Sequence, residues 1–476
     1  MRVRLPVPHP PLTSLEPAFA AIRAQAGVAE GYLPPVFFEA EHSGGDADAA
    51  HVVGTREDHT ALPFVTLDPE GSRDLDQAVH IEQDGSGFRV FYAIADVGAH
   101  VVPGGALDAD TRARVQTVYC PDRRIGLHPP VMSEGYASLL PGQKTKAVLW
   151  TLSIDDDGTL TETDVRRTWV RSTRQYAYDE LSSSPPAEAA GFLPLLRAVG
   201  ERRRALAVTR GAVTLPKPSQ EVLLHDGKVS LEFHAASRIE DDNAQISLMT
   251  GEAAAALMLG GGVGVLRTMP PADLRAIRRL RHQARALGIA WRDTESYGSL
   301  IARLDPSTPA VAAFYVHATM LFRGAAWVPF DDSKPELVRP ENVTHGALAV
   351  PYAHVTAPLR RLVDRYSTEI CLAIAAGREI PSWAREALTW LGEEMARGSR
   401  LARSVDVACL NTIESALLAS SVGEVFIGIG LDDRTVQLAD PAVIARCHGG
   451  IDEGAEQQVR LVSVDPSSGP TFERVT

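Results

Sequence analysis

PFVTLDPEGSRDLDQAVHI, residues 63–81, contains the clearest structural pattern of the sequence. Its opening run, PFVTLD, has the apolar character of a β-strand that ends at Asp68. Asp74 and Asp76 are two residues apart, so their carboxylates point the same way in an extended chain. The Gly71-Ser72 turn can fold Asp68 back beside them. We therefore predict a strand, a turn and a second strand, with three carboxylates gathered at one end.

Asp68, Asp74 and Asp76 have the spacing D-x5-D-x-D. Three neighbouring carboxylates would repel one another unless a divalent cation lay between them, and oxygen ligands alone fit Mg²⁺ or Mn²⁺ better than Zn²⁺. The pattern is weak by itself. Because 60 of the 476 residues are Asp or Glu, such a spacing arises roughly once by chance. An Asp-rich surface turn explains it equally well.

The composition of the chain is that of a soluble globular enzyme, with 45% hydrophobic and 22% charged residues. Its 476 residues are too many for one compact core, and about two to four domains are expected. The N-terminal MRVRLPVPHPPL lacks the apolar core of a secretory signal, and no apolar stretch approaches the ~20 residues that span a bilayer. The four cysteines are scattered. These features predict a cytoplasmic protein that does not contact a membrane.

The formal net charge of -13 argues against a nucleic-acid ligand, because phosphates attract basic surfaces. A protein that binds a metal through carboxylates can still confine its phosphate contacts to one channel. Basic runs occur at residues 202–204, 275–285 and 360–361. A solvated helix face is the more common explanation of the first two runs.

Hydrophobic patterning divides the chain into three parts. Residues 1–60 contain one clear helix that Ser14 can cap. Residues 61–419 begin with strands and continue with helices. Residues 420–476 consist of short strands separated by turns, which is typical of a small β-barrel.

Three features of the middle part can be placed more closely. Residues 147–170, AVLWTLSIDDDGTLTETDVRRTWV, predict a hairpin that turns at Asp157-Gly158. The segment from about residue 175 to 304 is predicted to be mostly helical. Thr356-Ala357-Pro358 is expected to open a long helix that Gly377 ends.

Four motifs, in this order, resemble the catalytic domain of the ribonuclease II/R (RNB) family. They are the stretch quoted above, FYAIADVGAHVVPGGALD (91–108), VYCPDRRIGLHPPVMSEGYASLLPG (118–142) and VPYAHVTAPLRRLVDRY (350–366). The family's patterns are D-x5-D-x-D-D, a V-A-I-A-D-V strand, a Y-L-P loop and Y-x-H-F-T-S-P-I-R-R-Y. The resemblance covers about residues 60–420.

The resemblance implies an α+β multidomain protein. It places an RNB catalytic domain of mixed sheet and helices at 61–419, a small helical, winged-helix-like module at 1–60 and a short OB-fold RNA-binding domain at 420–476. Family members begin with two cold-shock barrels, for which the 67 residues before Asp68 are too few. The chain therefore resembles a short variant without them.

The activity implied by the resemblance is 3′→5′ hydrolysis of single-stranded RNA to nucleoside 5′-monophosphates, with Mg²⁺ as cofactor and Mn²⁺ as a substitute. A monomer is expected. Asp68, Asp74 and Asp76 match three of the family's four active-site aspartates, with Asp76 in the position expected to be indispensable. The fourth position holds Gln77, which offers an oxygen to a metal but carries no charge. Metal affinity should therefore be lower than is usual in the family.

Several residues match positions that contact RNA in the family. Arg360 is expected in the first turn of the helix, where it can grip the scissile phosphate as a catalytic residue. Arg361 follows it, and Asp364 is expected to orient both arginines rather than to bind metal. The remaining matches are Tyr119, which stacks on the terminal bases, Tyr178, for which Tyr176 is a rival, and Glu252, which lines the base pocket.

Departures from the family pattern leave other functions open. The family's second stacking aromatic should fall near Thr214-Leu215, where neither residue is aromatic, and a late glutamate of the family is replaced around Ser404. The C-terminal barrel has few aromatics. An RNA-binding or regulatory protein with catalysis weakened by Gln77 is one alternative, and an endonuclease or a DNA exonuclease with the same metal site is another.

Overall fold

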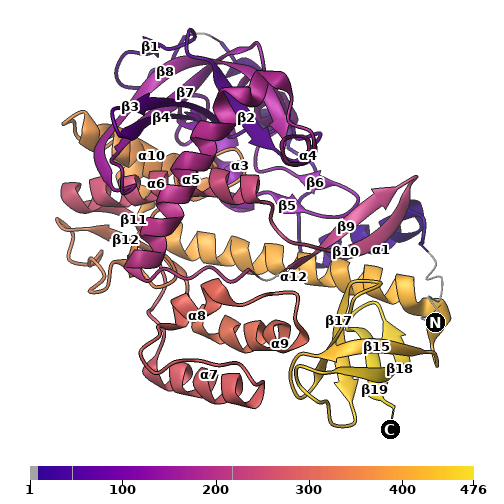
Figure 1. Cartoon of the computed structure of the whole chain (residues 1–476). Helices are drawn as coiled ribbons and strands as arrows, with labels where there is room; N and C mark the ends of the chain where they lie inside the picture. The colour runs from indigo at the N-terminus through magenta and orange to yellow at the C-terminus, as the bar shows by residue number, and fades with distance from the viewer. Residues whose placement is uncertain (1–8, 46, 217, 476) are drawn as a thin grey trace.

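A computed structural model describes residues 9–45, 47–216 and 218–475. The expectation about a secretory signal falls largely on residues 1–8, which lie outside the described residues. Figure 1 shows an upper body built on a curved sheet, the long helix α12 (Leu391–Leu418) crossing the molecule below it, and a lower layer of three helices beside a small barrel.

The central sheet is mixed, as predicted. Its strands are β1 (Glu57–Asp58), β2 (Phe64–Asp68), β3 (Gln77–Asp84), β4 (Gly87–Ala95), β7 (Lys144–Ile154) and β8 (Leu160–Ala177). Their order is β1-β8-β2-β3-β4-β7, and β8 also pairs with β7, so the sheet curls round. β2 and β3 are antiparallel, which confirms the strand–turn–strand unit. The 18 residues of β8 pair first with β7 and then, in parallel, with β2, which sets Ala177 beside Asp68.

Helices cover this sheet and share its core. They include α3 (Ala106–Arg114), α4 (Tyr178–Ser183), α5 (Phe192–Arg210), α6 (Arg238–Gly261), α10 (Leu362–Ala375) and α11 (Ser382–Ala387). α6 begins with a capping box, in which Ser237 and Glu240 each bind the other's backbone amide. α6 packs between α5 and α10, and α10 packs on β8. The largest apolar cluster of the protein lies between these helices and the sheet.

The helix expected to open at residues 356–358 begins later, at Leu362. Residues 356–361 form a loop because their backbone binds partners outside the helix. The amide of Leu359 donates to Asp76 Oδ1 over 2.7 Å, and the amide of Leu362 donates to the carbonyl of Val115 over 2.9 Å. These contacts hold the loop against the end of the sheet.

The N-terminal part contains two helices that pack on different neighbours. α1 (Leu12–Gln25) lies against α12, and α2 (Pro34–His42) lies against α3. α1 begins at Leu12, ahead of Ser14, whose hydroxyl donates to the carbonyl of Pro11 instead of capping the helix. The placement of Ser14 as the cap was therefore wrong, although the helix itself is confirmed.

The lower layer contains a helical excursion and a closed barrel. β11 (Val263–Thr268) pairs with β12 (Ala326–Asp331), and between them lie α7 (Leu274–Ala286), α8 (Tyr297–Arg303) and α9 (Pro309–Ala318). The barrel is formed by β15 (Val425–Gly430), β16 (Thr435–Leu438), β17 (Val443–His448), β18 (Glu456–Asp465) and β19 (Gly469–Arg474). The predicted C-terminal barrel is thus confirmed.

The remaining elements are short. They are the hairpin β9 (Ser219–His225) and β10 (Lys228–His234), and the two-residue strands β5 (Val118–Tyr119), β6 (Arg124–Ile125), β13 (Thr344–His345) and β14 (Val350–Pro351). Among the described residues, none of the helices combines the length and the apolar character that a membrane span requires.

Candidate active site

Asp68, Asp74 and Asp76 meet at one end of β2 and β3. Asp68 is the last residue of β2, and the other two lie in the extended segment before β3. Leu75 between them is fully buried, and its amide donates to Ser138 Oγ over 2.9 Å. Because alternate side chains of an extended chain point to opposite sides, burying Leu75 turns Asp74 and Asp76 away from the core.

A cavity of about 370 Å³ opens in front of these carboxylates. It is lined by Leu67, Asp68, Pro69, Ser72, Asp74, Asp76, Gln77, Tyr119, Arg124, Tyr178 and Arg360. The fold therefore brings together every residue predicted to be catalytic or to bind metal, and with them two of the tyrosines predicted to bind RNA.

Burial controls the charge of two of the carboxylates. Asp76 is only 5% exposed, and its burial raises its pKa to about 8 despite the nearby guanidinium of Arg360 and the bond from the Leu359 amide. Burial also raises the pKa of Asp68 to about 7, and the negative charge of Asp74 adds to this rise. At neutral pH both groups therefore hold protons for much of the time, unless a cation compensates their charge.

Asp74 is neutralised by Arg124, a residue that the sequence reasoning missed. Arg124 forms an ion pair with Asp74 and a second one with Glu134, at 2.6 Å. It belongs to β6, which follows Tyr119 through a tight turn in the 118–142 loop. The sequence feature that could have indicated Arg124 is the Arg-Arg pair at 123–124, which lies in the same motif as Tyr119.

The donor set fits a hard divalent cation. The three carboxylates offer oxygen atoms to the cavity, and burial raises the pKa of Asp68 and of Asp76 despite the nearby guanidinium of Arg360, so a cation could still stabilise their negative charge. In the described parts of the chain, no group of three or more His, Cys, Asp or Glu is already arranged to hold a metal ion. Asp74 Oδ1 accepts a hydrogen bond from Arg124, so Arg124 would compete with a metal for this carboxylate.

Gln77 is held by two hydrogen bonds. Its Nε2 donates to the carbonyl of Thr356 over 2.7 Å, and its Oε1 accepts from the hydroxyl of buried Tyr92 over 2.5 Å. The amide therefore ties β3 to the 356–361 loop. As a metal ligand, Gln77 would have to share its Oε1 with Tyr92, and its predicted role in metal binding stays a prediction.

The side chains of Arg360 and Arg361 lie in different environments. Arg360 lies before the helix and not, as had been predicted, in its first turn, so the backbone amides of the helix N-terminus do not surround its side chain. Its Nε is 3.5 Å from Asp76 Oδ2. Arg361 is held by Asp364 through two bonds, of 2.5 and 2.8 Å. The prediction that Asp364 orients an arginine is thus confirmed for Arg361, whereas Arg360 stands free of Asp364 and reaches the cavity.

The predicted RNA-contacting residues divide into two groups. Tyr119 is 54% exposed on the cavity rim, and Tyr178 lines the cavity with its hydroxyl bound to the carbonyl of Leu67. Tyr176, the rival of Tyr178, is buried in the core. Glu252 does not join them, because α6 turns it toward α5.

On that face of α6, Glu252 pairs with Arg203 at 2.5 Å and with Arg210 at 2.8 Å. The neighbouring Gly251 is packed too closely against Tyr352 to admit a side chain. The part of α6 expected to line a base pocket is therefore occupied by contacts within the protein.

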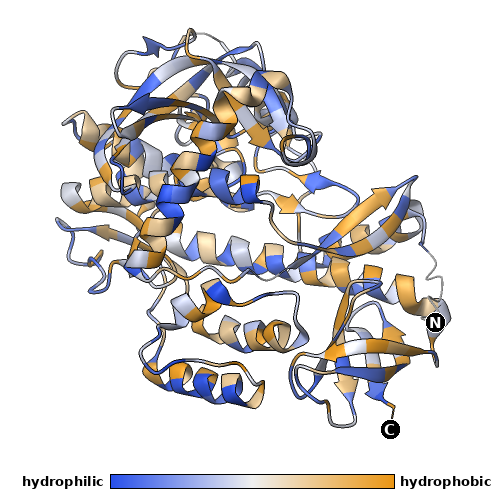
Figure 2. Ribbon diagram, viewed as in Figure 1, coloured by the Kyte–Doolittle hydropathy of each residue, from blue (hydrophilic) through white to orange (hydrophobic). Residues whose placement is uncertain are grey.

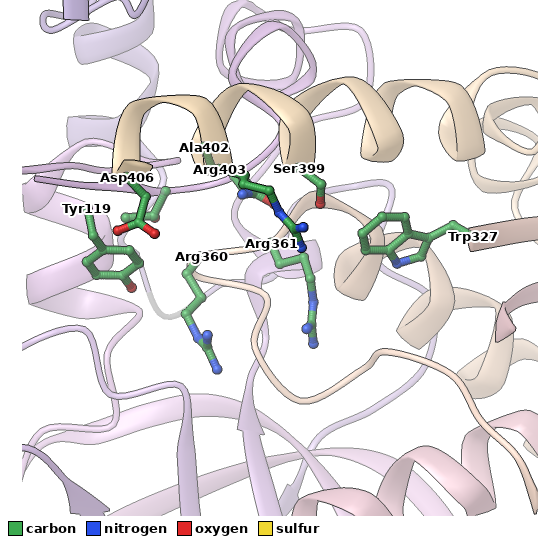
Figure 3. Close-up of a pocket in the computed structure, with 10 residues that line it drawn as sticks. Tyr119, Trp327, Arg360, Arg361, Ser399, Ala402, Arg403 and Asp406 are labelled. Carbon is green, nitrogen blue, oxygen red and sulfur yellow. The ribbon is translucent and has the colours of Figure 1, made fainter. Parts of the chain in front are cut away.

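A second cavity, of about 420 Å³, adjoins the first and shares Tyr119 and Arg360 with it. In Figure 3, Tyr119 and Asp406 lie at one end and Trp327 at the other, with Arg360, Arg361 and Arg403 between them. Two residues that line this cavity were not predicted from the sequence. The structure shows an aromatic ring at Trp327 and a carboxylate at Asp406, two positions after Ser404.

Comparisons with known proteins identify the family of the chain. The RNB domain matches residues 56–374, and the RNase II-type exonuclease C-terminal S1 domain matches residues 428–475. Ribonuclease R of Aquifex aeolicus is 26% identical over 385 residues, covering 76% of this chain and 53% of that protein. Exoribonuclease 2 of Proteus mirabilis is 29% identical over 222 residues, covering 44% and 34%. The chain thus spans about a third of the length of the exoribonuclease 2 relatives and about half of that of ribonuclease R.

Solved structures show the same fold. The apo form of Mycoplasma genitalium RNase R has a TM-score of 0.83 and 16% identity, covering 96% of this chain and 78% of that one. The same protein is also known in complex with ribose methylated single-stranded RNA. Yeast Ssd1, described as a pseudonuclease, has a TM-score of 0.64 and 16% identity, covering 87% and 51%. At such identities the likeness concerns the fold alone.

Proposed function

Because the chain belongs to the RNB-domain family of ribonucleases, we propose that it is a 3′→5′ exoribonuclease that shortens single-stranded RNA and releases nucleoside 5′-monophosphates. One observation carries the proposal. The three aspartates, an arginine and two tyrosines from distant parts of the sequence line a single cavity. A ribonuclease of low sequence preference needs these groups together: anionic metal ligands, a cation for the phosphate and rings for the bases.

Asp68, Asp74 and Asp76 would hold the cofactor, Mg²⁺ or Mn²⁺, with Gln77 as a neutral neighbour. The bound ion would supply Lewis-acid activation of water and stabilisation of charge on the phosphate. Burial raises the pKa of Asp68 and of Asp76 because water stabilises their negative charge poorly. A cation bound between these carboxylates would stabilise that charge instead.

Arg360 is the residue placed to hold the scissile phosphate. Its guanidinium reaches into both cavities beside Asp76, and a guanidinium can donate two parallel hydrogen bonds to phosphate oxygens. Tyr119 on the rim offers its ring to a base at the 3′ end, where stacking requires no particular sequence. The ring of Tyr178 is fixed by two hydrogen bonds of its hydroxyl, one to Leu67 and one from Asn243.

Purified protein incubated with 5′-labelled RNA and DNA oligomers, in Mg²⁺ or in EDTA, tests the proposal on a sequencing gel. We expect a ladder of RNA shortened from the 3′ end, no ladder in EDTA and intact DNA. Internal cuts at the earliest times, or a ladder that persists in excess EDTA, would contradict it.

The competing function, RNA binding without turnover, rests on the neutral Gln77 and on the pairing of Asp74 with Arg124. It requires that the same protein retard RNA in a gel-shift experiment while the ladder is absent in both Mg²⁺ and Mn²⁺.

A further inference from the structure

The helix α7 carries a stripe of arginines that the active site does not use. Exposed basic side chains occur on one face at Arg275, Arg278, Arg279, His282 and Arg285. Their spacing of three and four residues keeps them on one side of a helix. The opposite side, with Ala276, Leu280 and Ala284, is buried against α9. The arginine stripe is defined here by Arg275, Arg278, Arg279 and Arg285.

The stripe has no internal anionic partner. Within residues 9–45, 47–216 and 218–475, none of its four guanidiniums forms an ion pair or a hydrogen bond. Arg281, on the flank of the same helix, differs in that it stacks on Trp291 and pairs with Asp293. Exposed arginines without an ion pair contribute little to the stability of the fold, so stability does not explain why four of them lie on this face.

The charge of the stripe is opposite to that of its surroundings. The whole chain carries -13, and residues 420–476 contain nine acidic side chains against four arginines. α9 and the C-terminal end of α7 contact this acidic barrel: His317 of α9 lies 3.2 Å from Glu453, and Gly454 packs against Leu287 and Ala310. Because of this charge difference, the arginine stripe should attract a polyanion more strongly than the barrel does.

We propose that the arginine stripe of α7 binds the phosphodiester backbone of single-stranded RNA, at nucleotides on the 5′ side of those in the cavity. This inference rests on the proposed exoribonuclease function for the identity of the ligand. From Arg275 to Arg285 the helix rises about 15 Å, so the stripe is long enough to contact more than one phosphate of the same strand.

The position of the stripe fits such a role. Figure 1 shows α7 on the lower layer, on the other side of α12 from the sheet that carries the aspartates, and Figure 2 shows hydrophilic residues recurring along its exposed side. A strand held there would be anchored far from the reacting end. Only an RNA long enough to reach from the cavity to α7 gains this contact, and short oligomers do not.

Binding of labelled RNA in EDTA, measured by fluorescence anisotropy over a series of salt concentrations, tests the inference. The test protein is the full chain with Arg278→Gln and Arg279→Gln. Each lost phosphate contact lowers the slope of log K against log salt by ~0.7, so this variant should lose ~1.4 of the slope and bind an RNA of about 30 nucleotides roughly 20-fold more weakly at ~0.1 M salt. Its affinity for an RNA of about 6 nucleotides should not change.

A matched control removes the same charge from the upper body. Arg171 on β8 and Arg197 on α5 are also exposed and also lack an ion pair among the described residues. The protein with Arg171→Gln and Arg197→Gln should bind both RNAs like the wild type. Equal losses in the two variants, or an unchanged affinity of the Arg278/Arg279 variant for the long RNA, would overturn the inference.

Turnover separates this inference from the proposed function. If no RNA is degraded in Mg²⁺ while binding of the long RNA still depends on the stripe, the stripe stands and the catalytic proposal fails. If the Arg278/Arg279 variant degrades the 6-nucleotide RNA at the wild-type rate and also binds the long RNA with wild-type affinity, the catalytic proposal stands. The stripe is then a solvated helix face.

Discussion

Replacing Asp76 with asparagine should stabilise the metal-free protein and at the same time abolish its activity. Asp76 is buried, and its pKa in the folded protein is about 8, compared with an ordinary value of 3.8. Ionising it in the fold therefore costs roughly 6 kcal/mol more than ionising it in the unfolded chain. Asparagine retains an oxygen that can accept the Leu359 amide, and it has no charge to bury.

The sign of this effect gives the prediction a pH signature. Between pH 3.8 and about 8 the folded protein holds more protons on Asp76 than the unfolded chain does, so rising pH lowers the stability of the metal-free wild type. The variant lacks this loss. The difference in free energy of unfolding between Asp76→Asn and wild type should therefore grow by about 3 kcal/mol in favour of the variant between about pH 5.5 and about pH 9.

Urea unfolding of both EDTA-treated proteins at the two pH values measures this difference, and addition of Mg²⁺ should raise the stability of the wild type more than that of the variant. Initial rates on RNA in Mg²⁺ should fall on the order of 10² or more in the variant, because a ligand that places charge at the reacting phosphate is lost. A pH-independent stability difference would refute the role of burial. Turnover within a few-fold of wild type would refute the catalytic assignment of Asp76.

Three further variants test the neighbours of Asp76. Gln77→Asp should lower the Mg²⁺ concentration for half-maximal rate in a metal titration, while the lost donor to the Thr356 carbonyl costs about 1–3 kcal/mol of unfolding free energy; an equal or greater metal requirement would place Gln77 outside the metal site. Tyr119→Ala should change the length of the shortest resistant RNA fragment, since each stacked base is worth ~1–3 kcal/mol, and an unchanged end product would make Tyr119 a packing residue. Arg124→Gln frees Asp74 and should lower the Mg²⁺ requirement several-fold; a higher requirement would show that Arg124 assists the metal site instead of competing for it.

The strand–turn–strand unit could be predicted because its determinants are local. The apolar run before Asp68, the turn and the alternation around Leu75 lie within nineteen residues, and the structure confirms all three. The start of α10 could not be predicted in this way. It is set by the bond from Leu359 to Asp76, which joins residues 283 positions apart, and helix-capping rules consider only neighbours.

The site residues that belong to a sequence motif could be predicted. The residues that only tertiary contact brings to the site could not. Arg124 meets Asp74 across 50 positions, and Trp327 and Asp406 reach the second cavity from β12 and α12. No spacing rule links such segments. Glu252 shows the converse, since its position in α6 was read correctly as helical, but the direction of its side chain depends on Arg203 and Arg210 of a neighbouring helix.

The distribution of charge explains how an acidic protein can be suited to a polyanion. Carboxylates beside the reacting phosphate would repel it unless protons, arginines or a cation neutralise them, and each kind of neutralisation has a candidate here: the raised pKa values of Asp68 and Asp76, the pairing of Asp74 with Arg124, and the predicted metal. The neutral Gln77 removes a further negative charge from the same place. A phosphate entering the cavity therefore meets Arg360 before it meets an uncompensated carboxylate. The affinity lost by weakening the metal site is partly offset by lower repulsion of the substrate, which is why Gln77→Asp should improve metal binding more than it improves turnover.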